Sequence, residues 1–292
     1  MNPTRPPGPK YLLSLTALLK SNRPVLGKIE KSLREKSYWS DSVKTPLFAP
    51  ASYRAHDYSI VGSAFDYWLR AFFISQCDLR ESETVVEKYL KLSKMNPNDK
   101  AVDIEKGEIT LESAMRRTVK ERRAMIRDKD ITSTEFFENC IENGMFEGLY
   151  RSGRLDMISC PSDDMVADLI GLSSLATDRS LHLFAGAAID VNPVFSNEIF
   201  AADGDFALGN RLVDIKTTKD LATALVFVQV LCYSLIEAWR RGSTTSSLKY
   251  NEIAVYSARF GAMGVVELVD VKPEVEQISI FLRKAAAEHK AS

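Results

Sequence analysis

The chain has 292 residues, of which 45% are hydrophobic and 26% are charged, a composition that fits one large globular domain or two small ones. A net charge of −1 at pH 7 excludes a global positive field, so any contact with nucleic acid has to come from local patches. No apolar run approaches the ~20 residues that a membrane helix needs. We therefore expect a cytoplasmic protein without a membrane partner.

The cysteines also argue against a metal or disulfide framework. None of them forms a Cys-x-x-Cys pair, and zinc-type spacing is missing. They are Cys77, Cys140, Cys160 and Cys232. Reduced thiols in a cytoplasmic protein are the expected state.

The N-terminal part of the chain is dominated by helical patterns. Residues 1–10 are rich in proline and predict a flexible arm. Helices are predicted over 11–20, 25–36, 60–73, 81–95, 110–128, 132–143 and 165–177. Residues 37–58 have few periodic apolar residues and predict a loop. We expect residues 11–180 to be mainly helical.

One of these helices, 110–128, carries basic residues along one face. They are Arg116, Lys120, Arg123 and Arg127. Such a stripe either follows a phosphate backbone or is an ordinary solvated face, interleaved here with Glu121 and Asp128.

From residue 185 the pattern changes to that of strands. Strands are predicted over 187–195, 200–208, 211–217, 252–258 and 264–271, with helices over 219–241 and 273–288. This order predicts an α/β core over 185–292 with a mixed central β-sheet.

Residues 202–218 predict a β-hairpin. Gly209-Asn210 suits a two-residue loop of type II′, which places Leu208 opposite Arg211. Continuing that register places Asp205 opposite Asp214. Because side chains alternate along a strand, Asp214 and Lys216 share one face.

The charges of this hairpin have two interpretations. Opposed carboxylates repel each other. A hard cation between Asp205 and Asp214 would turn this repulsion into a net attraction. In the same register Asp203 falls opposite Lys216 and is an alternative partner for it. A surface hairpin with solvated charges is the other interpretation.

These residues resemble the signature of the PD-(D/E)XK nuclease superfamily, with Asp205, Asp214 and Lys216 as the matching residues. In the following helix, Gln229 and Tyr233 resemble the Gln-x-x-x-Tyr motif of RecB-type members and lie on one face. The resemblance covers about a quarter of the chain, from roughly residue 189 to residue 259. Gly204 stands where the family often has proline.

The resemblance implies a restriction-endonuclease-like core, in which helices flank a mixed central β-sheet that contains the antiparallel hairpin. A single nuclease domain over 11–292 would then combine this core with the largely helical N-terminal half. The resemblance also implies a Mg²⁺ ion, replaceable by Mn²⁺, held by Asp205, Asp214 and the backbone carbonyl of Ile215. Lys216 would orient the nucleophile and stabilise the developing charge. Gln229 and Tyr233 would contact DNA or fix the site.

Two further acids and the cysteines bear on the same site. Asp66 resembles a polar residue of the first core helix of RecB-type nucleases, and the alternative is an i,i+4 ion pair with Arg70. Glu198 precedes the hairpin and is either an extra ligand or an exposed glutamate. The iron–sulfur cluster of some RecB-type members needs cysteines near the C-terminus, and none follows Cys232.

The function that these features favour is a Mg²⁺-dependent nuclease that hydrolyses DNA phosphodiester bonds, as a RecB-like exonuclease. The alternative is a catalytically inactive nuclease-fold module for DNA binding or assembly. A metal-dependent hydrolase of another phosphate ester ranks third. DNA is the expected partner, and a protein partner or a homo-oligomer stays open.

Overall fold

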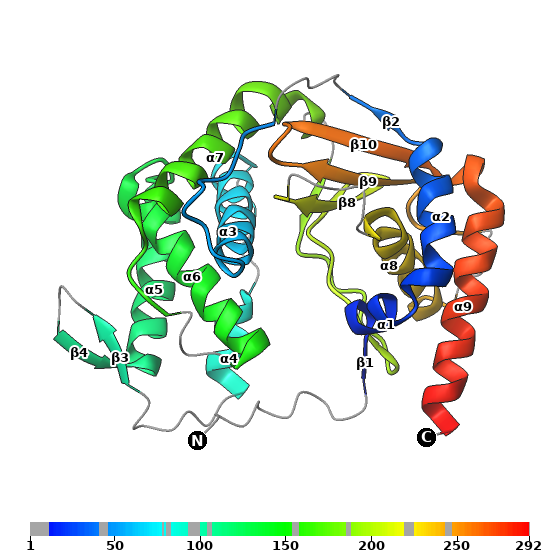
Figure 1. The fold of residues 1–292 in the computed structure, drawn as a ribbon, viewed down its shortest axis with the longest axis horizontal. Helices are drawn as coiled ribbons and strands as arrows, with labels where there is room; N and C mark the ends of the chain where they lie inside the picture. Colours follow the sequence, from blue (N-terminus) through cyan, green and yellow to red (C-terminus); the bar gives the residue numbers. More distant parts are fainter. Residues whose placement is uncertain are drawn as a thin grey trace. The chain divides into compact units, whose positions relative to one another are not determined.

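The computed structural model describes residues 12–40, 46–77, 79, 83–92, 100–103, 107–153, 158–184, 188–218, 225–242 and 247–291. The protein is an α/β protein with a mixed six-stranded sheet (Figure 1). The chain divides into two compact units. One comprises residues 1–8 and 47–175, and the other comprises residues 9–46 and 176–292.

The first unit is mainly helical. It contains α3 (Asp57–Cys77), α4 (Val85–Leu92), α5 (Leu111–Arg127), α6 (Thr134–Ser152), most of α7 (Asp163–Phe184), and the hairpin of β3 (Lys100–Asp103) and β4 (Gly107–Thr110). Helix α6 packs along α3 and also against α5. The helix starts follow the sequence, because Thr110 and Ser133 each accept a hydrogen bond from the backbone amide three residues later.

The predicted end of α6 at Asn143-Gly144 is wrong, because the helix continues to Ser152. The Asn143 side chain is fully buried and donates to the carbonyl oxygen of Asn139 at 2.9 Å. A Cβ atom on Gly144 would lie 2.6 Å from the backbone oxygen of Ile60 in α3. Here the glycine permits a close approach of two helices and does not act as a helix stop.

The second unit contains the six-stranded sheet, in the order β2-β10-β9-β8-β7-β5. Its strands are β2 (Tyr38–Trp39), β5 (Ile189–Val191), β7 (Phe206–Leu208), β8 (Arg211–Lys216), β9 (Glu252–Ser257) and β10 (Ala262–Glu267). Strands β5, β7 and β8 are antiparallel neighbours, whereas β8 and β9 are parallel. Helix α8 (Val226–Arg240) connects the parallel pair, as a parallel crossover requires.

Several predictions for the sheet are wrong in part. Among the described residues, the strand expected over 187–195 is confined to β5, and the strand expected over 264–271 gives way to a short helix from Leu268. Strand β2 lies inside 37–58, which was expected to be a loop. The strand expected over 200–208 is split into β6 (Phe200–Ala201) and β7. Between them the backbone pairs elsewhere, because Phe195 N–H donates to the Ala202 carbonyl at 2.9 Å and Gly204 N–H donates to the Pro193 carbonyl at 3.0 Å.

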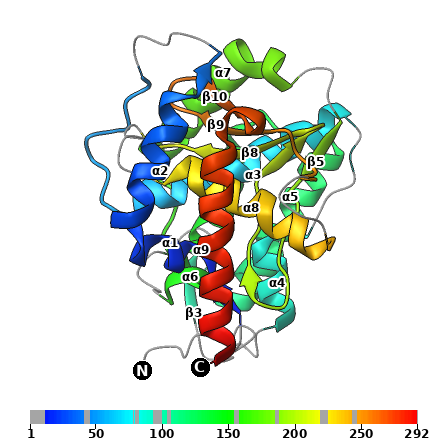
Figure 2. The ribbon, with the colours of Figure 1, turned by 90° about the vertical axis from the view of Figure 1, so that its right-hand side faces the viewer.

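Helix α8 packs on β8 and β9, and α2 (Arg23–Glu35) and α9 (Lys272–Ala291) pack against α8. Helix α9 follows the short helix η2 (Leu268–Val271). Figure 2 shows α9 in front, with α2 beside it. The buried side chains Leu212, Ile253 and Val255 of the sheet share one core with residues of these helices. Burying each such aliphatic side chain contributes roughly 1.5–3 kcal/mol. Helix α1 (Leu15–Ser21) joins this core, and β1 (Leu13–Ser14) pairs with β6.

Within the described ranges, no helix is both long enough and apolar enough to span a bilayer.

Candidate active site

The hairpin of β7 and β8 has the register predicted from its turn. Phe206 pairs with Val213, and Leu208 pairs with Arg211. Of the two turn residues, only Gly209 has a positive φ, at 58°, which identifies a type II′ turn. Asp205 directly precedes β7, so it lies one step beyond the ladder on the side of Asp214.

The Asp205 carboxylate is anchored on β8. Its Oδ2 accepts a hydrogen bond of 2.6 Å from the backbone N–H of Ile215. Its backbone carbonyl accepts a second hydrogen bond, of 2.9 Å, from Asn192 N–H. Asn192 has a φ of 57°, a conformation that asparagine tolerates better than most residues. Asp205 is therefore held from both neighbouring segments.

Asp214 and Lys216 form an ion pair on the face that α8 covers. Asp214 is 3% exposed, and Lys216 Nζ lies against its Oδ2. Burial raises the pKa of Asp214 to about 6, against the lowering effect of the Lys216 ammonium. The negative charge of Asp205 raises this pKa further, so the two acids interact.

Helix α8 brings a second polar pair to the same place. Gln229 Nε2 donates a hydrogen bond of 2.5 Å to Tyr233 Oη. Tyr233 is 6% exposed, and burial raises the pKa of its phenol. The charges of Asp214 and Asp205 raise it as well, which places this ring within electrostatic range of both acids. Thus the sequence-predicted residues gather at the C-terminal end of β8.

Phe195 was not predicted as part of this site. Its ring stacks on Tyr233 with the centroids 5.7 Å apart and an interplanar angle of 22°. A Cβ atom on Gly204 would lie 2.6 Å from Phe195 Cε2, so the ring occupies the space next to that glycine. No periodicity links Phe195 to Tyr233, since they meet only through the folded sheet.

Asp205 and Asp214 are the carboxylates available for a metal ion. Among the described residues, no group of three or more histidine, cysteine, aspartate or glutamate side chains is arranged to hold one. Mg²⁺ fits two carboxylates because it completes its shell with water and substrate oxygens. A cation would also offset the repulsion that raises the pKa of Asp214. Glu198 is exposed, and the Ile215 carbonyl stays a predicted ligand.

Asp203 does not occupy the position expected for it. The ladder between β7 and β8 ends at Phe206 and Val213, so it does not reach Asp203. The backbone of Asp203 pairs with Val194 on the other side, and its side chain is exposed.

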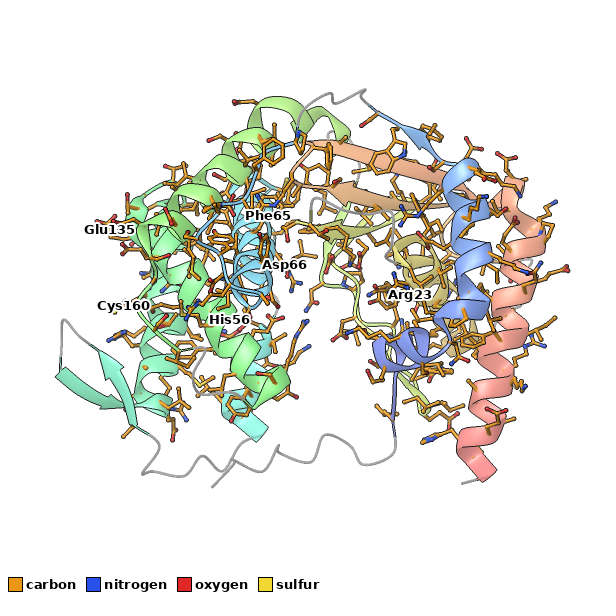
Figure 3. All side chains as sticks on the ribbon, viewed as in Figure 1. Arg23, His56, Phe65, Asp66, Glu135 and Cys160 are labelled. Atoms are coloured by element: carbon orange, nitrogen blue, oxygen red, sulfur yellow. The ribbon has the colours of Figure 1, made fainter. Side chains whose placement is uncertain are left out.

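In the helical unit, Asp66 lies on α3 (Figure 3). It forms an ion pair with Arg70 of the same helix. Arg70 Nε donates to Asp66 Oδ1 at 2.8 Å, which confirms the i,i+4 interpretation. The basic face of α5 is largely paired with acids. Arg116 pairs with Glu112, Arg123 with Glu87, and Arg127 with Asp128. This pairing favours a solvated, ion-paired face over a phosphate-binding stripe.

A hollow of about 650 Å³ in the sheet unit lies away from Asp205 and Asp214. It is lined by residues such as Asn210, Glu252 and Lys272. In the parallel pairing of β8 with β9, Arg211 lies opposite Glu252, which lines the hollow, and Lys216 lies opposite Ser257. The hollow is therefore at the Arg211 end of β8, about 16 Å from the Lys216 end.

No protein-family model, no curated protein and no solved structure matches this chain. A functional conclusion consequently rests on the side chains gathered at the end of β8.

Proposed function

We propose that the protein is a Mg²⁺-dependent nuclease that hydrolyses DNA phosphodiester bonds, and that it is a RecB-like exonuclease. One observation carries this proposal. Asp205 is anchored on Ile215 N–H beside the buried Asp214–Lys216 pair, and Tyr233 lies within range of both acids. Two acids and a lysine in this order match the Asp…Asp-x-Lys pattern of PD-(D/E)XK nucleases.

The order of the elements supports the same proposal. Strand β5 is followed by the β7–β8 hairpin, then by α8, and then by β9 parallel to β8. Strand, hairpin, helix and parallel strand are the sequence of elements that a restriction-endonuclease-like core requires. The helix of the Gln-x-x-x-Tyr pattern thereby packs directly on the strand that carries Asp214.

The roles in catalysis follow from the chemistry of each group. Asp205, Asp214 and the Ile215 carbonyl would hold Mg²⁺, with Mn²⁺ as a substitute. When bound, such an ion shields phosphate charge and lowers the pKa of bound water. The Lys216 ammonium orients the nucleophile and stabilises the charge that develops on the phosphate. Gln229 and Tyr233, joined by their hydrogen bond, contact the DNA or keep the acids in place.

The test is a cleavage assay on linear, circular and single-stranded DNA with Mg²⁺ or with EDTA. We expect wild-type protein to cut at least one of these forms only with the metal. Asp214→Asn and Lys216→Ala are expected to lose activity, whereas Asp203→Asn, at an exposed acid two residues before Asp205, is expected to keep it. Equal cleavage by wild type and the two site variants would contradict the proposal.

A second candidate is the inactive DNA-binding or assembly module. The ion pair of Lys216 with Asp214 favours it, because this pair compensates the buried charge without any metal. Calorimetric titration with Mn²⁺ separates the two candidates. Binding that Asp205→Ala abolishes supports the nuclease, and the absence of binding supports the module. A hydrolase of another phosphate ester would bind the metal but leave DNA intact.

A further inference from the structure

Within residues 225–242, which the structure describes, no side chain of α8 caps its own first turn. Its N-cap residue Leu225 makes no side-chain hydrogen bond, and the first turn contains no acidic residue. The first N–H groups of a helix have no acceptor within the helix and need one from elsewhere. This matters because Gln229 lies at the end of that first turn and Tyr233 one turn later.

The missing cap comes from Glu30 in α2. Its Oε2 accepts a hydrogen bond from Val228 N–H at 2.9 Å, and its Oε1 accepts a weaker one from Phe227 N–H at 3.4 Å. Arg34, one turn later in α2, donates Nε–H to Oε1 at 2.9 Å. A carboxylate at a helix N-terminus is also stabilised by the positive end of the helix dipole.

Glu30 is 4% exposed and lies among apolar neighbours in the core of this unit. Burying a carboxylate is costly unless it is paired and hydrogen-bonded, and burial raises the pKa of Glu30. A leucine at this position would fill the core without that cost. Capping α8 from a second helix accounts for the charge.

We propose that Glu30 is a positioning residue for the candidate active site. By accepting hydrogen bonds from the N–H groups of Phe227 and Val228, Glu30 fixes where α8 starts and how it is rotated about its axis. It thereby fixes the position of the Gln229–Tyr233 pair beside the two acids. This inference rests on the proposed nuclease function. Glu30 itself touches no reacting group and acts through the helix.

Phe195 is the second restraint on the same helix, because it stacks on the Tyr233 ring. The first turn is thus held at its N–H groups and the second turn at its aromatic side chain. A displacement of the reacting geometry by about 1 Å reduces turnover by up to about 100-fold. Loss of Glu30 is therefore expected to affect turnover more than DNA affinity.

The experiment compares Glu30→Ala and Glu30→Gln with wild type. Glu35→Gln is the matched control, because Glu35 ends the same helix and pairs only loosely, at 3.7 Å, with the exposed Lys31. Two quantities are measured well below the melting temperature: hydrogen exchange at the Phe227 and Val228 amides, and kcat and KM on DNA with Mg²⁺.

Glu30→Ala is expected to speed exchange at both amides and to lower kcat roughly 10- to 100-fold, with KM changed by less than about twofold. Glu30→Gln keeps one acceptor oxygen and is expected to recover part of the lost kcat. Glu35→Gln is expected to behave as wild type. A cap with a purely structural role would lower the melting temperature and leave kcat unchanged, which would overturn the proposal.

Two outcomes need their own readout. If Glu30→Ala does not fold, Glu30→Gln serves as the test variant. Amide exchange and kcat of Glu30→Gln equal to those of Glu35→Gln would then overturn the proposal. If wild type cuts no DNA, the proposed function fails on its own. The NMR signal of the Gln229 side-chain amide then reports on the site: a shift in Glu30→Gln but not in Glu35→Gln supports the positioning role, and no shift refutes it.

Discussion

The backbone N–H of Ile215 donates a 2.6 Å hydrogen bond to Oδ2 of Asp205. This bond fastens the first acid of the hairpin to the strand that carries the second acid, Asp214. The hairpin ladder itself ends before Asp205, at Phe206 and Val213. Beyond the end of the backbone ladder, the Asp205 side chain therefore links the two strands by its own hydrogen bond. The two carboxylate charges stay close enough to interact.

Replacing Asp205 by asparagine tests that interaction. Asn retains an oxygen for Ile215 N–H but removes the negative charge that raises the pKa of Asp214. We therefore expect the pKa of Asp214 to fall below about 6 in Asp205→Asn, measured by NMR titration of its carboxyl carbon without metal. Asp203→Asn, at an exposed position, should leave it unchanged. An unchanged or higher pKa in Asp205→Asn would show that the two acids do not interact.

Asp214 is expected to weaken the metal-free fold at neutral pH. Its pKa is raised in the folded state, so its stabilising contribution is complete below the unfolded pKa near 4 and is lost as the pH rises through about 6. Asp214→Asn should therefore favour the folded state more at pH 7.5 in EDTA than at pH 4, relative to wild type.

The measurement is urea unfolding of wild type and Asp214→Asn at pH 4 and pH 7.5. The advantage of the variant should be large at the higher pH and small at the lower one. A gain that is independent of pH would contradict the assigned ionisation.

Gly204 is expected to tolerate no side chain. A Cβ atom there meets Phe195 Cε2 at 2.6 Å, and Phe195 stacks on Tyr233. Gly204→Ala should cost about 1–3 kcal/mol of unfolding free energy through overpacking. Gly27→Ala in α2 is the control, since nothing lies within 4 Å of its Cβ position and alanine favours the helix by up to about 1 kcal/mol. Equal stability of the two variants would show that Phe195 yields without strain.

Much of the hairpin is predictable because its determinants are local. The Gly209-Asn210 turn sets the register, and alternation then assigns Asp214 and Lys216 to one face. The contacts that hold the site from outside the hairpin are not predictable in this way. Glu30 and Phe195 reach α8 only after the chain has folded, and neither belongs to a spacing pattern.

The helical unit shows the same limit of local signals. Asn143-Gly144 has the residues of a helix stop, and tertiary packing of α6 on α3 overrides them. Gly144→Ala should therefore destabilise this unit although alanine is the better helix former, because the Cβ would meet a backbone oxygen of Ile60 at 2.6 Å. A melting temperature equal to or above that of wild type would contradict this account of the α3–α6 contact.

In the proposed function, Asp205, Asp214 and Lys216 form a metal-dependent nuclease site. Its most direct test is the rate at which purified protein releases labelled nucleotide from linear DNA, with Mg²⁺ and with EDTA, for wild type and Asp214→Asn. The site predicts release by wild type with Mg²⁺ alone, and a rate at least about 100-fold lower for a folded Asp214→Asn. Release that persists in EDTA, or that proceeds equally fast in the variant, would contradict it.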